Sequence, residues 1–183
     1  PYPDGGEIVV SDFWPRWHAP SRKILGIGHT VRYLDNRVVA GKNPRSTAYS
    51  TYDPATRSWT PWKTLDVPAG SNLVSSGAGS VGRHDLPNGD ILLPVYANPV
   101  RDGKALPSLA SVIRCRFDGT TLRFVEQGNE MTVPTGRGFG EPSLAAFQGR
   151  YFLTLRNDDY LAIARGKDGL HFEEPRKVKF DDG

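Results

Sequence analysis

The sequence predicts an all-β fold, in which about three four-stranded blades form part of a β-propeller. The 183 residues include 20 Gly and 15 Pro, and they show no apolar helical periodicity longer than a turn or two. Such a composition favours strands joined by turns. Short apolar strands also recur every 60 to 67 residues, and a period of that size built from strand signals is typical of a propeller. The alternative is a self-contained open β-sandwich.

Three strands carry the repeat, and each follows a turn-type pair of residues. They are Lys23–His29, Asp90–Tyr96 and Arg150–Arg156. We expect them to be the inner strands of three consecutive blades. Their last residues, His29, Tyr96 and Arg156, should then face a common axis.

The repeat predicts a single domain over residues 1–183. Its blades should lie at about 12–68, 75–134 and 137–180. Because a closed propeller typically needs four to eight blades, we expect either further blades from a longer protein or self-association of two such chains.

The first stretch of the chain is dense in aromatic residues. Trp17 and His18 lie beside prolines in the segment 12–18, which indicates an ordered loop. A Trp can stack on a sugar ring, so both are candidate substrate-binding residues, although packing of the aromatic rings between blades is the alternative. His29 ends its strand in the same slot as Arg156 and is a candidate catalytic residue, unless local partners satisfy it.

Small residues fill the segment 71–82. They permit a close approach of the chain to the pseudo-axis. Arg83 and His84 follow directly, and a cationic pair that enters an inner strand is costly unless it faces a cavity or a partner. Arg83 is therefore a candidate substrate-binding residue and His84 a candidate catalytic one, with ordinary rim charges as the alternative.

Turns around Asp53, Asp118 and Asp168 each precede an aromatic residue. An Asp in a turn hydrogen-bonds its own turn backbone, so we interpret these three as structural.

Charge and composition argue against several kinds of partner. The formal charge of +3 is spread over 23 basic and 20 acidic residues, without the basic run that a nucleic-acid groove needs, whereas an anionic small ligand is compatible with it. No apolar run approaches the roughly 18 residues of a membrane span. The single Cys115 allows no internal disulfide and no cysteine metal cluster. We therefore expect neither a metal nor a cofactor.

Two segments resemble sialidase motifs. Residues 77–96 resemble the form GPGxGxxLxxGRLxxPxY, and the segment from Gly140-Glu141 to Arg156 resembles the next blade, NExxxxELxdGxLxLNxR. Residues 12–29 weakly resemble the blade before, and the outer turns look like degenerate Asp-boxes of the form SxDxGxTW. The likeness covers about residues 12–178.

The resemblance implies a sialidase-like propeller of six blades with its site at the axis. By motif match, Glu141 takes the place of the glutamate that polarises a tyrosine nucleophile, and Arg156 that of one of three arginines that bind the substrate carboxylate. The nucleophile, the other two arginines and the acid aspartate belong to other family segments. The implied function is glycoside hydrolysis on glycans with an acidic sugar. Tyr96, which ends its strand in the position aligned with Arg156, is a further candidate substrate-binding residue. We expect a secreted or periplasmic protein, although this chain shows no signal peptide.

Departures from the motifs keep two alternatives open. The FRIP-type arginine motif of the first sialidase blade is absent from this sequence. Sialidases also do not depend on histidine at the positions where this chain has His29 and His84. Related propellers include rhamnosidases and uronic-acid polysaccharide lyases centred on a His with Arg and Tyr. Such a lyase would use Arg156 or Arg83 to neutralise the uronate, His29 or His84 as base and Tyr96 as acid. A non-catalytic carbohydrate-binding propeller is the other alternative.

Overall fold

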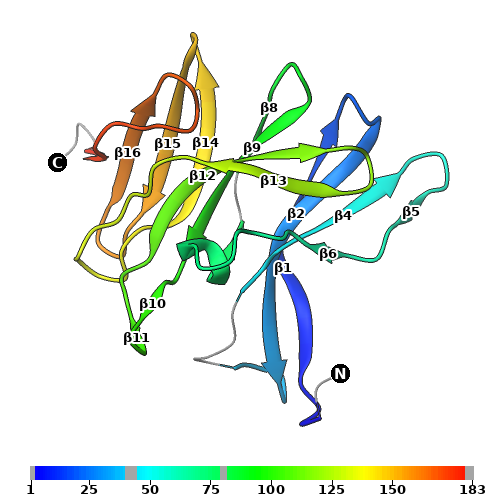
Figure 1. Ribbon diagram of the computed structural model, residues 1–183, viewed down its shortest axis with the longest axis horizontal. Helices are drawn as coiled ribbons and strands as arrows, with labels where there is room; N and C mark the ends of the chain where they lie inside the picture. Colours follow the sequence, from blue (N-terminus) through cyan, green and yellow to red (C-terminus); the bar gives the residue numbers. More distant parts are fainter. Residues whose placement is uncertain (1–2, 40–44, 79–81, 180–183) are drawn as a thin grey trace.

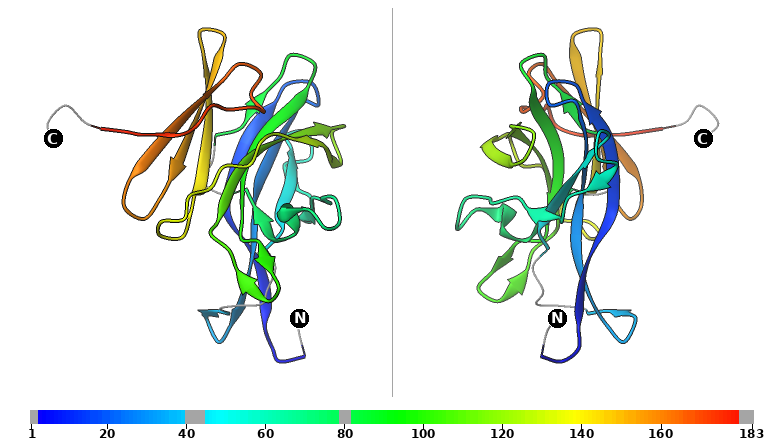
Figure 2. Two further views of the ribbon diagram at one scale, coloured as in Figure 1. Left: turned by 60° about the vertical axis from the view of Figure 1, so that its left-hand side comes forward. Right: turned by 90° about the vertical axis from the view of Figure 1, so that its right-hand side faces the viewer.

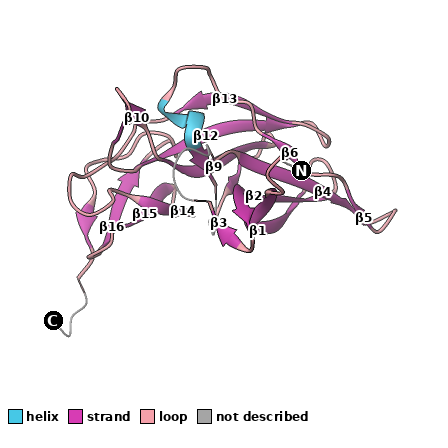
Figure 3. Ribbon diagram, turned by 90° about the horizontal axis from the view of Figure 1, so that it is seen from below, coloured by secondary structure: helices cyan, strands magenta, loops and turns pink. Residues whose placement is uncertain are grey.

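The computed structural model describes residues 3–39, 45–78 and 82–179, and strands make up nearly all of their regular structure (Figures 1 and 3). These residues form three antiparallel sheets and one small separate hairpin. The all-β prediction is confirmed. No helix among the described residues has the length and apolar character to cross a membrane.

The first sheet has the strand order β1-β2-β4-β5, with β3 beside β2 and β6 beside β4. Its long hairpin pairs β1 with β2, and a bulge interrupts the register between Ser11 and Trp14. The strands of this sheet are β1 (Glu7–His18), β2 (Lys23–Leu34), β3 (Arg37–Val38), β4 (Thr47–Asp53), β5 (Ser58–Trp59) and β6 (Lys63–Thr64).

The second sheet has the order β13-β12-β9-β7, and β8 also pairs with β9. A short 3₁₀ turn, Asn72–Ser75, leads into it. Its strands are β7 (Ser76–Gly77), β8 (His84–Asp85), β9 (Asp90–Ala97), β12 (Leu109–Phe117) and β13 (Leu122–Gln127). The separate hairpin joins β10 (Val100–Arg101) to β11 (Lys104–Ala105).

The third sheet has the order β14-β15-β16-β17. Its strands are β14 (Gly140–Phe147), β15 (Arg150–Arg156), β16 (Leu161–Gly166) and β17 (Arg176–Lys177). Figure 2 shows the three sheets as separate blades, with the second between the other two. The boundary expected at residue 180 lies outside the described residues.

Strand β9 explains why the second sheet is central. Its sequence, DILLPVYA, is apolar at nearly every position because both of its faces are covered. Ile91, Leu93 and Val95 belong to the core shared with the first sheet. Leu92 belongs to the core shared with the third sheet, where it joins Leu153. Two apolar layers therefore hold three blades together.

The repeat aligns β2, β9 and β15, and these occupy equivalent places in the three sheets. Each is the second strand of its sheet. The edge strand beside it is β1 in the first sheet, β7 together with β8 in the second, and β14 in the third. The prediction that they are the inner strands was therefore wrong by one strand. Strands β7 and β8 are two residues long and lack an apolar run, so the sequence pattern did not reveal this edge.

The outer faces of the first and third sheets remain partly uncovered. On the first sheet, register pairs place Trp17, Ile24, Tyr52 and Trp59 in one row, on the face opposite the buried Leu25. Trp17 is 49% exposed and Trp59 45%. On the third sheet, Phe147 and Leu161 are exposed in the same way.

Candidate functional site

A cavity of about 240 Å³ opens where the second sheet meets the third. Its lining residues come from the ends of β9 and β15, the start of β14 and the loops beside these strands, together with Arg45 from the loop before β4 of the first sheet. They are Arg45, Tyr96, Asn98, Ser108, Arg137, Gly138, Gly140, Glu141, Arg156 and Asp158. The volume is just below the roughly 300–1,000 Å³ of sites for drug-sized ligands, so the cavity suits a small polar group.

Glu141 and Arg156 form an ion pair in this pocket, with 2.6 Å between Oε1 and Nη1. Glu141 lies in the β14 bulge between Gly140 and Ser143, at a φ of 45°. Positive φ is uncommon in residues other than Gly, and bulges often redirect a side chain near a site. Both side chains are about half exposed, so the pair contributes at most about 1 kcal/mol to stability.

Arg137 holds Asp158 in a forked ion pair. Its Nε and Nη2 lie 2.9 and 2.8 Å from Asp158 Oδ1, and its backbone N–H donates to Oδ2 at 3.0 Å. These bonds hold the pKa of Asp158 below its usual value. Gly138 lets the segment lie against the start of β12, because a Cβ there would stand 2.2 Å from the carbonyl oxygen of Ser108.

Arg45 contacts Tyr96 rather than a carboxylate. Its Nη1 donates to Tyr96 Oη, and the guanidinium carbon lies 5.4 Å from the centre of the ring. Burial raises the pKa of Tyr96, and the positive charge of Arg45 partly offsets this. Three guanidinium groups thus face two carboxylates in the lining, which carries one net positive charge.

His29 lies behind Tyr96, with 6.3 Å between the ring centres in an edge-to-face arrangement. The His29 side chain is almost fully buried, and its Nδ1 is 3.8 Å from Asp12 Oδ2. Burial, followed by Arg45, lowers the pKa of His29, while Asp12 and the Ala78 backbone act in the opposite direction. The ring packs on Gly77, where a Cβ would stand 2.6 Å from His29 Cβ.

The structure therefore brings the three expected strand ends together: Tyr96 and Arg156 line one pocket, and His29 contacts Tyr96. Within the segment 71–82, Gly77 approaches a neighbouring strand closely, where it packs on His29. Residues 79–81 of that segment lie outside the described residues.

His18 and Trp17 lie at the other end of the β1–β2 hairpin. His18 is fully buried, and its ring nitrogens are 2.9 Å from Ser21 Oγ and 3.1 Å from the Gly89 carbonyl oxygen. Its ring also meets Phe117 edge-on. Neither side chain lines the pocket, so the structure gives His18 a packing role and leaves Trp17 on the outer face of the first sheet.

Arg83 joins the first and second sheets. It is 4% exposed, and its guanidinium donates to the carbonyl oxygens of Leu25 at 2.7 Å and Arg16 at 3.1 Å and pairs with Asp85 at 2.9 Å. The partners that this buried cation needs are thus the Asp85 carboxylate and the backbone of the neighbouring blade. His84 meets the ring of Tyr151 at 5.4 Å. Neither residue lines the pocket.

Sequence reasoning did not single out Arg45, Arg137 or Asp158. All three lie in loops, where no periodicity marks a residue. The one signal was the run Asn157-Asp158-Asp159, which follows Arg156 directly and extends the polar end of β15.

Solved structures share this fold, whereas no protein-family model and no curated protein matches the chain. Trypanosoma rangeli sialidase in complex with sialic acid is 16% identical with a TM-score of 0.62, and the match covers 90% of this chain and 27% of that one. An N-acetylgalactosamine deacetylase from F. plautii is 12% identical with a TM-score of 0.51, over 93% of this chain and 53% of that one. The chain has the fold of part of a sialidase-like β-propeller and spans about a quarter of the sialidase's length.

Proposed function

We propose that the pocket binds a glycan that carries an acidic sugar and hydrolyses its glycosidic bond. The observation that carries this proposal is the Glu141–Arg156 pair, which is half exposed and lies in a pocket whose guanidinium groups outnumber its carboxylates. A pair so exposed adds little stability. Its place on a strained bulge is therefore better explained by a ligand than by packing.

The charges of the lining favour an anionic ligand. Arg137 is held by Asp158, and Arg156 is shared with Glu141, whereas Arg45 donates to a neutral phenol. Because guanidinium forks match carboxylates in shape and charge, we assign Arg156 and Arg45 to the substrate carboxylate.

Polar groups elsewhere in the lining suit a sugar. Asn98 and Ser108 bond each other at 2.6 Å and have further donors and acceptors for sugar hydroxyls. We assign Glu141 to proton transfer at the reacting bond, since a carboxylate placed in a pocket is a common general base.

Replacing Arg156 with Ala tests the proposal in the full-length protein. Each charge-assisted hydrogen bond contributes about 1.5–3 kcal/mol, so the loss of two lowers kcat/KM on acidic glycans by a factor on the order of one hundred or more. Activity on neutral glycans should fall much less.

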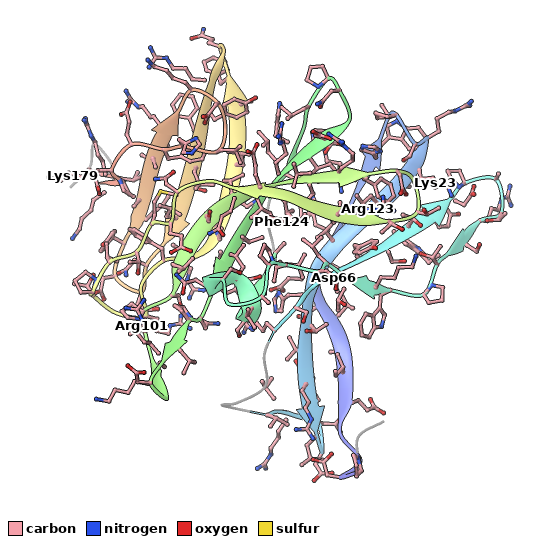
Figure 4. All side chains as sticks on the ribbon, viewed as in Figure 1. Lys23, Asp66, Arg101, Arg123, Phe124 and Lys179 are labelled. Atoms are coloured by element: carbon pink, nitrogen blue, oxygen red, sulfur yellow. The ribbon has the colours of Figure 1, made fainter. Side chains whose placement is uncertain are left out.

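The matched control is Arg123→Ala. Like Arg156, Arg123 is an exposed arginine paired with a carboxylate, here that of Asp118. Figure 4 labels Arg123 in the β12–β13 hairpin and Arg101 in the β10–β11 hairpin, which lie at opposite ends of the second sheet. The pocket lies at the Arg101 end, beside Asn98, so Arg123 is far from it. Equal losses on acidic and neutral glycans in Arg156→Ala would contradict a carboxylate-binding role.

A second candidate is β-elimination on uronic-acid glycans. The Arg45–Tyr96 pair favours it, because a phenol held by a guanidinium can exchange the proton while the cation neutralises a uronate. In that reaction a base takes the proton next to the carboxylate, the glycosidic oxygen leaves and a carbon–carbon double bond forms. An ultraviolet-absorbing unsaturated product would indicate the lyase, whereas oxygen-18 from labelled water in the reducing sugar would indicate the hydrolase.

Binding without turnover is the remaining outcome, and calorimetry with an acidic monosaccharide separates it from both reactions. Secretion or export to the periplasm stays a prediction, which cell fractionation tests.

A further inference from the structure

Two carboxylates beside the pocket lie on strained bulges in different sheets. Asp12 lies in the β1 bulge between Ser11 and Trp14, at a φ of 49°, and Glu141 lies in the β14 bulge, at a φ of 45°. The charges of both act on the Tyr96 phenol. Strained backbone of this kind clusters at functional sites, and here two instances flank one side chain.

His29 lies between Asp12 and Tyr96. Its Nδ1 faces Asp12 Oδ2 across 3.8 Å, and within the described part of the chain this nitrogen is buried without a hydrogen-bond partner. A buried polar atom without a partner is rare in native proteins and calls for an explanation. The gap to Asp12 is about 1 Å longer than an ordinary hydrogen bond, so a small movement of the half-exposed Asp12 would close it.

We propose that Asp12 and His29 form a positioning pair for Tyr96, and that Tyr96 is the proton donor to the leaving oxygen of the glycan. The inference rests on the proposed function. The His29 Nδ1–H donates to Asp12, which fixes the imidazole edge against the Tyr96 ring and so aims Tyr96 Oη into the pocket. Arg45 has five N–H donors and can hold Oη and a substrate carboxylate together.

The chemical step balances with water as the second reactant. The glycosidic bond breaks as Tyr96 gives its proton to the departing oxygen. Water adds its oxygen to the sugar carbon, and Glu141 takes the proton that this water releases. Proton exchange with solvent then restores both side chains.

The surroundings of His29 suit a neutral positioning ring. Burial and the charge of Arg45 disfavour its protonated form, while Asp12, Glu141 and the Ala78 backbone favour it less strongly, so its pKa stays below the usual value. Among the residues that the structure describes, Tyr96 is the other titratable group in ring contact with it. At neutral pH the ring therefore carries one N–H, and Nδ1 is the nitrogen that has Asp12 in front of it.

A first experiment needs no substrate. Asp12→Asn removes the charge, and Asn tolerates the left-handed backbone at this position. Because the Asp12 carboxylate raises the pKa values of both His29 and Tyr96, the variant should lower both. Nuclear magnetic resonance follows His29, and ultraviolet difference spectra follow Tyr96 with Tyr96→Phe as the blank.

The matched control is Asp53→Asn, in which the lost carboxylate faces Lys23 at 3.7 Å in the same sheet. It should leave both titrations unchanged. Unchanged titrations of His29 and Tyr96 in Asp12→Asn would overturn the positioning pair.

A second experiment uses the full-length protein and two glycosides of one acidic sugar, one with an aryl leaving group of low pKa and one with a sugar leaving group. Loss of a proton donor matters most when the leaving group is poor. Tyr96→Phe should therefore lower kcat on the sugar glycoside roughly a hundredfold or more and on the aryl glycoside much less. Asp12→Asn and His29→Gln should lower kcat in the same pattern, by about tenfold, with KM unchanged.

The outcomes separate this inference from the proposed function. Equal losses on both glycosides, or a change in KM alone, would refute the proton-donor role of Tyr96. If the unaltered protein cleaves neither glycoside, the proposed function fails, and the titrations still decide whether Asp12 and His29 form a pair. The side chain of Asp12 is 42% exposed, so we expect Asp12→Asn to fold. This variant therefore still tests the pair if the buried substitution His29→Gln does not fold.

Discussion

Acidic side chains in the outer turns and in the pocket are held in different ways. At the tip of the β12–β13 hairpin, Asp118 accepts two backbone N–H groups of its own turn and the guanidinium of Arg123. In the pocket, Glu141 accepts one guanidinium hydrogen bond, and beside the pocket Asp12 Oδ2 lies 3.8 Å from His29 Nδ1. The outer carboxylate is placed by its own loop, whereas Glu141 and Asp12 are each placed by a strained bulge.

The difference shows which carboxylates are available to a ligand. The guanidinium of Arg123, then the Thr120 side chain and the turn backbone, hold the pKa of Asp118 far below its usual range. Asp168 is similar. Burial raises its pKa, but hydrogen bonds from N–H groups of His171 and Leu170 outweigh this effect and lower the pKa to about 2. Such groups are fixed as anions with filled acceptor sites. Glu141 keeps acceptor capacity on the oxygen that Arg156 does not use.

The largest expected effect comes from Glu141→Gln. The change keeps the shape and removes the proton acceptor, so kcat on acidic glycans should fall by roughly 10² to 10⁴, while the melting temperature stays nearly constant because the pair is half exposed. The control is Glu126→Gln, whose carboxylate pairs with Arg114 at 2.8 Å outside the pocket. Similar activities for the two variants would remove the distinction between pocket and periphery.

An intermediate effect is expected from Gly77→Ala. The new methyl group would stand 2.6 Å from His29 Cβ, and overpacking of this kind destabilises by about 1–3 kcal/mol. His29 should move, and the titration of Tyr96 should shift with it. The control is Gly70→Ala, where the added atom has open space. The positive φ of Gly70, which Gly77 does not share, makes this change cost stability without touching the pocket. An unshifted Tyr96 titration in Gly77→Ala would show that His29 does not position the phenol.

The smallest effect is expected from Asp168→Asn in the outer turn of the third sheet. Its pKa is lowered from 3.8 in the unfolded state to about 2 in the folded state. The ionised carboxylate therefore stabilises the protein at pH values above 3.8, and this contribution is lost as the pH falls from 3.8 towards 2. After a discount for its exposure, the variant should unfold about 1 kcal/mol more easily at neutral pH. Urea unfolding at several pH values measures this, and glycan activity should be unchanged. A pH-independent difference would contradict the linkage.

The fold could be predicted from the sequence where a strand is covered on both faces. The apolar run of β9 marked it, and the repeat placed β2 and β15 in equivalent positions. Sequence could not reveal that β7 and β8 form the free edge, because two-residue strands made of small or polar residues carry no periodic signal. Their pairing follows from the position of β9 in space.

The candidate site was predictable in part. Tyr96, Glu141 and Arg156 end or begin strands, and such positions are visible in an interrupted apolar pattern. Arg45 lies in a loop, and its place beside Tyr96 depends on how two sheets stack. Arg83 showed the same polar signal as the pocket residues, yet its partners are the Asp85 carboxylate and backbone carbonyls such as that of Leu25, 58 residues away. Residue type alone could not separate these cases.

The uncovered face of the first sheet has a consequence for spectroscopy. All four tryptophans of the chain are exposed, from 44% at Trp62 to 58% at Trp14. Native emission should therefore lie at long wavelength and be open to collisional quenchers, and unfolding should change it little. The same signal should shift to shorter wavelength when a second copy or another sheet covers Trp17 and Trp59, so tryptophan emission in this protein reports association rather than the integrity of the core.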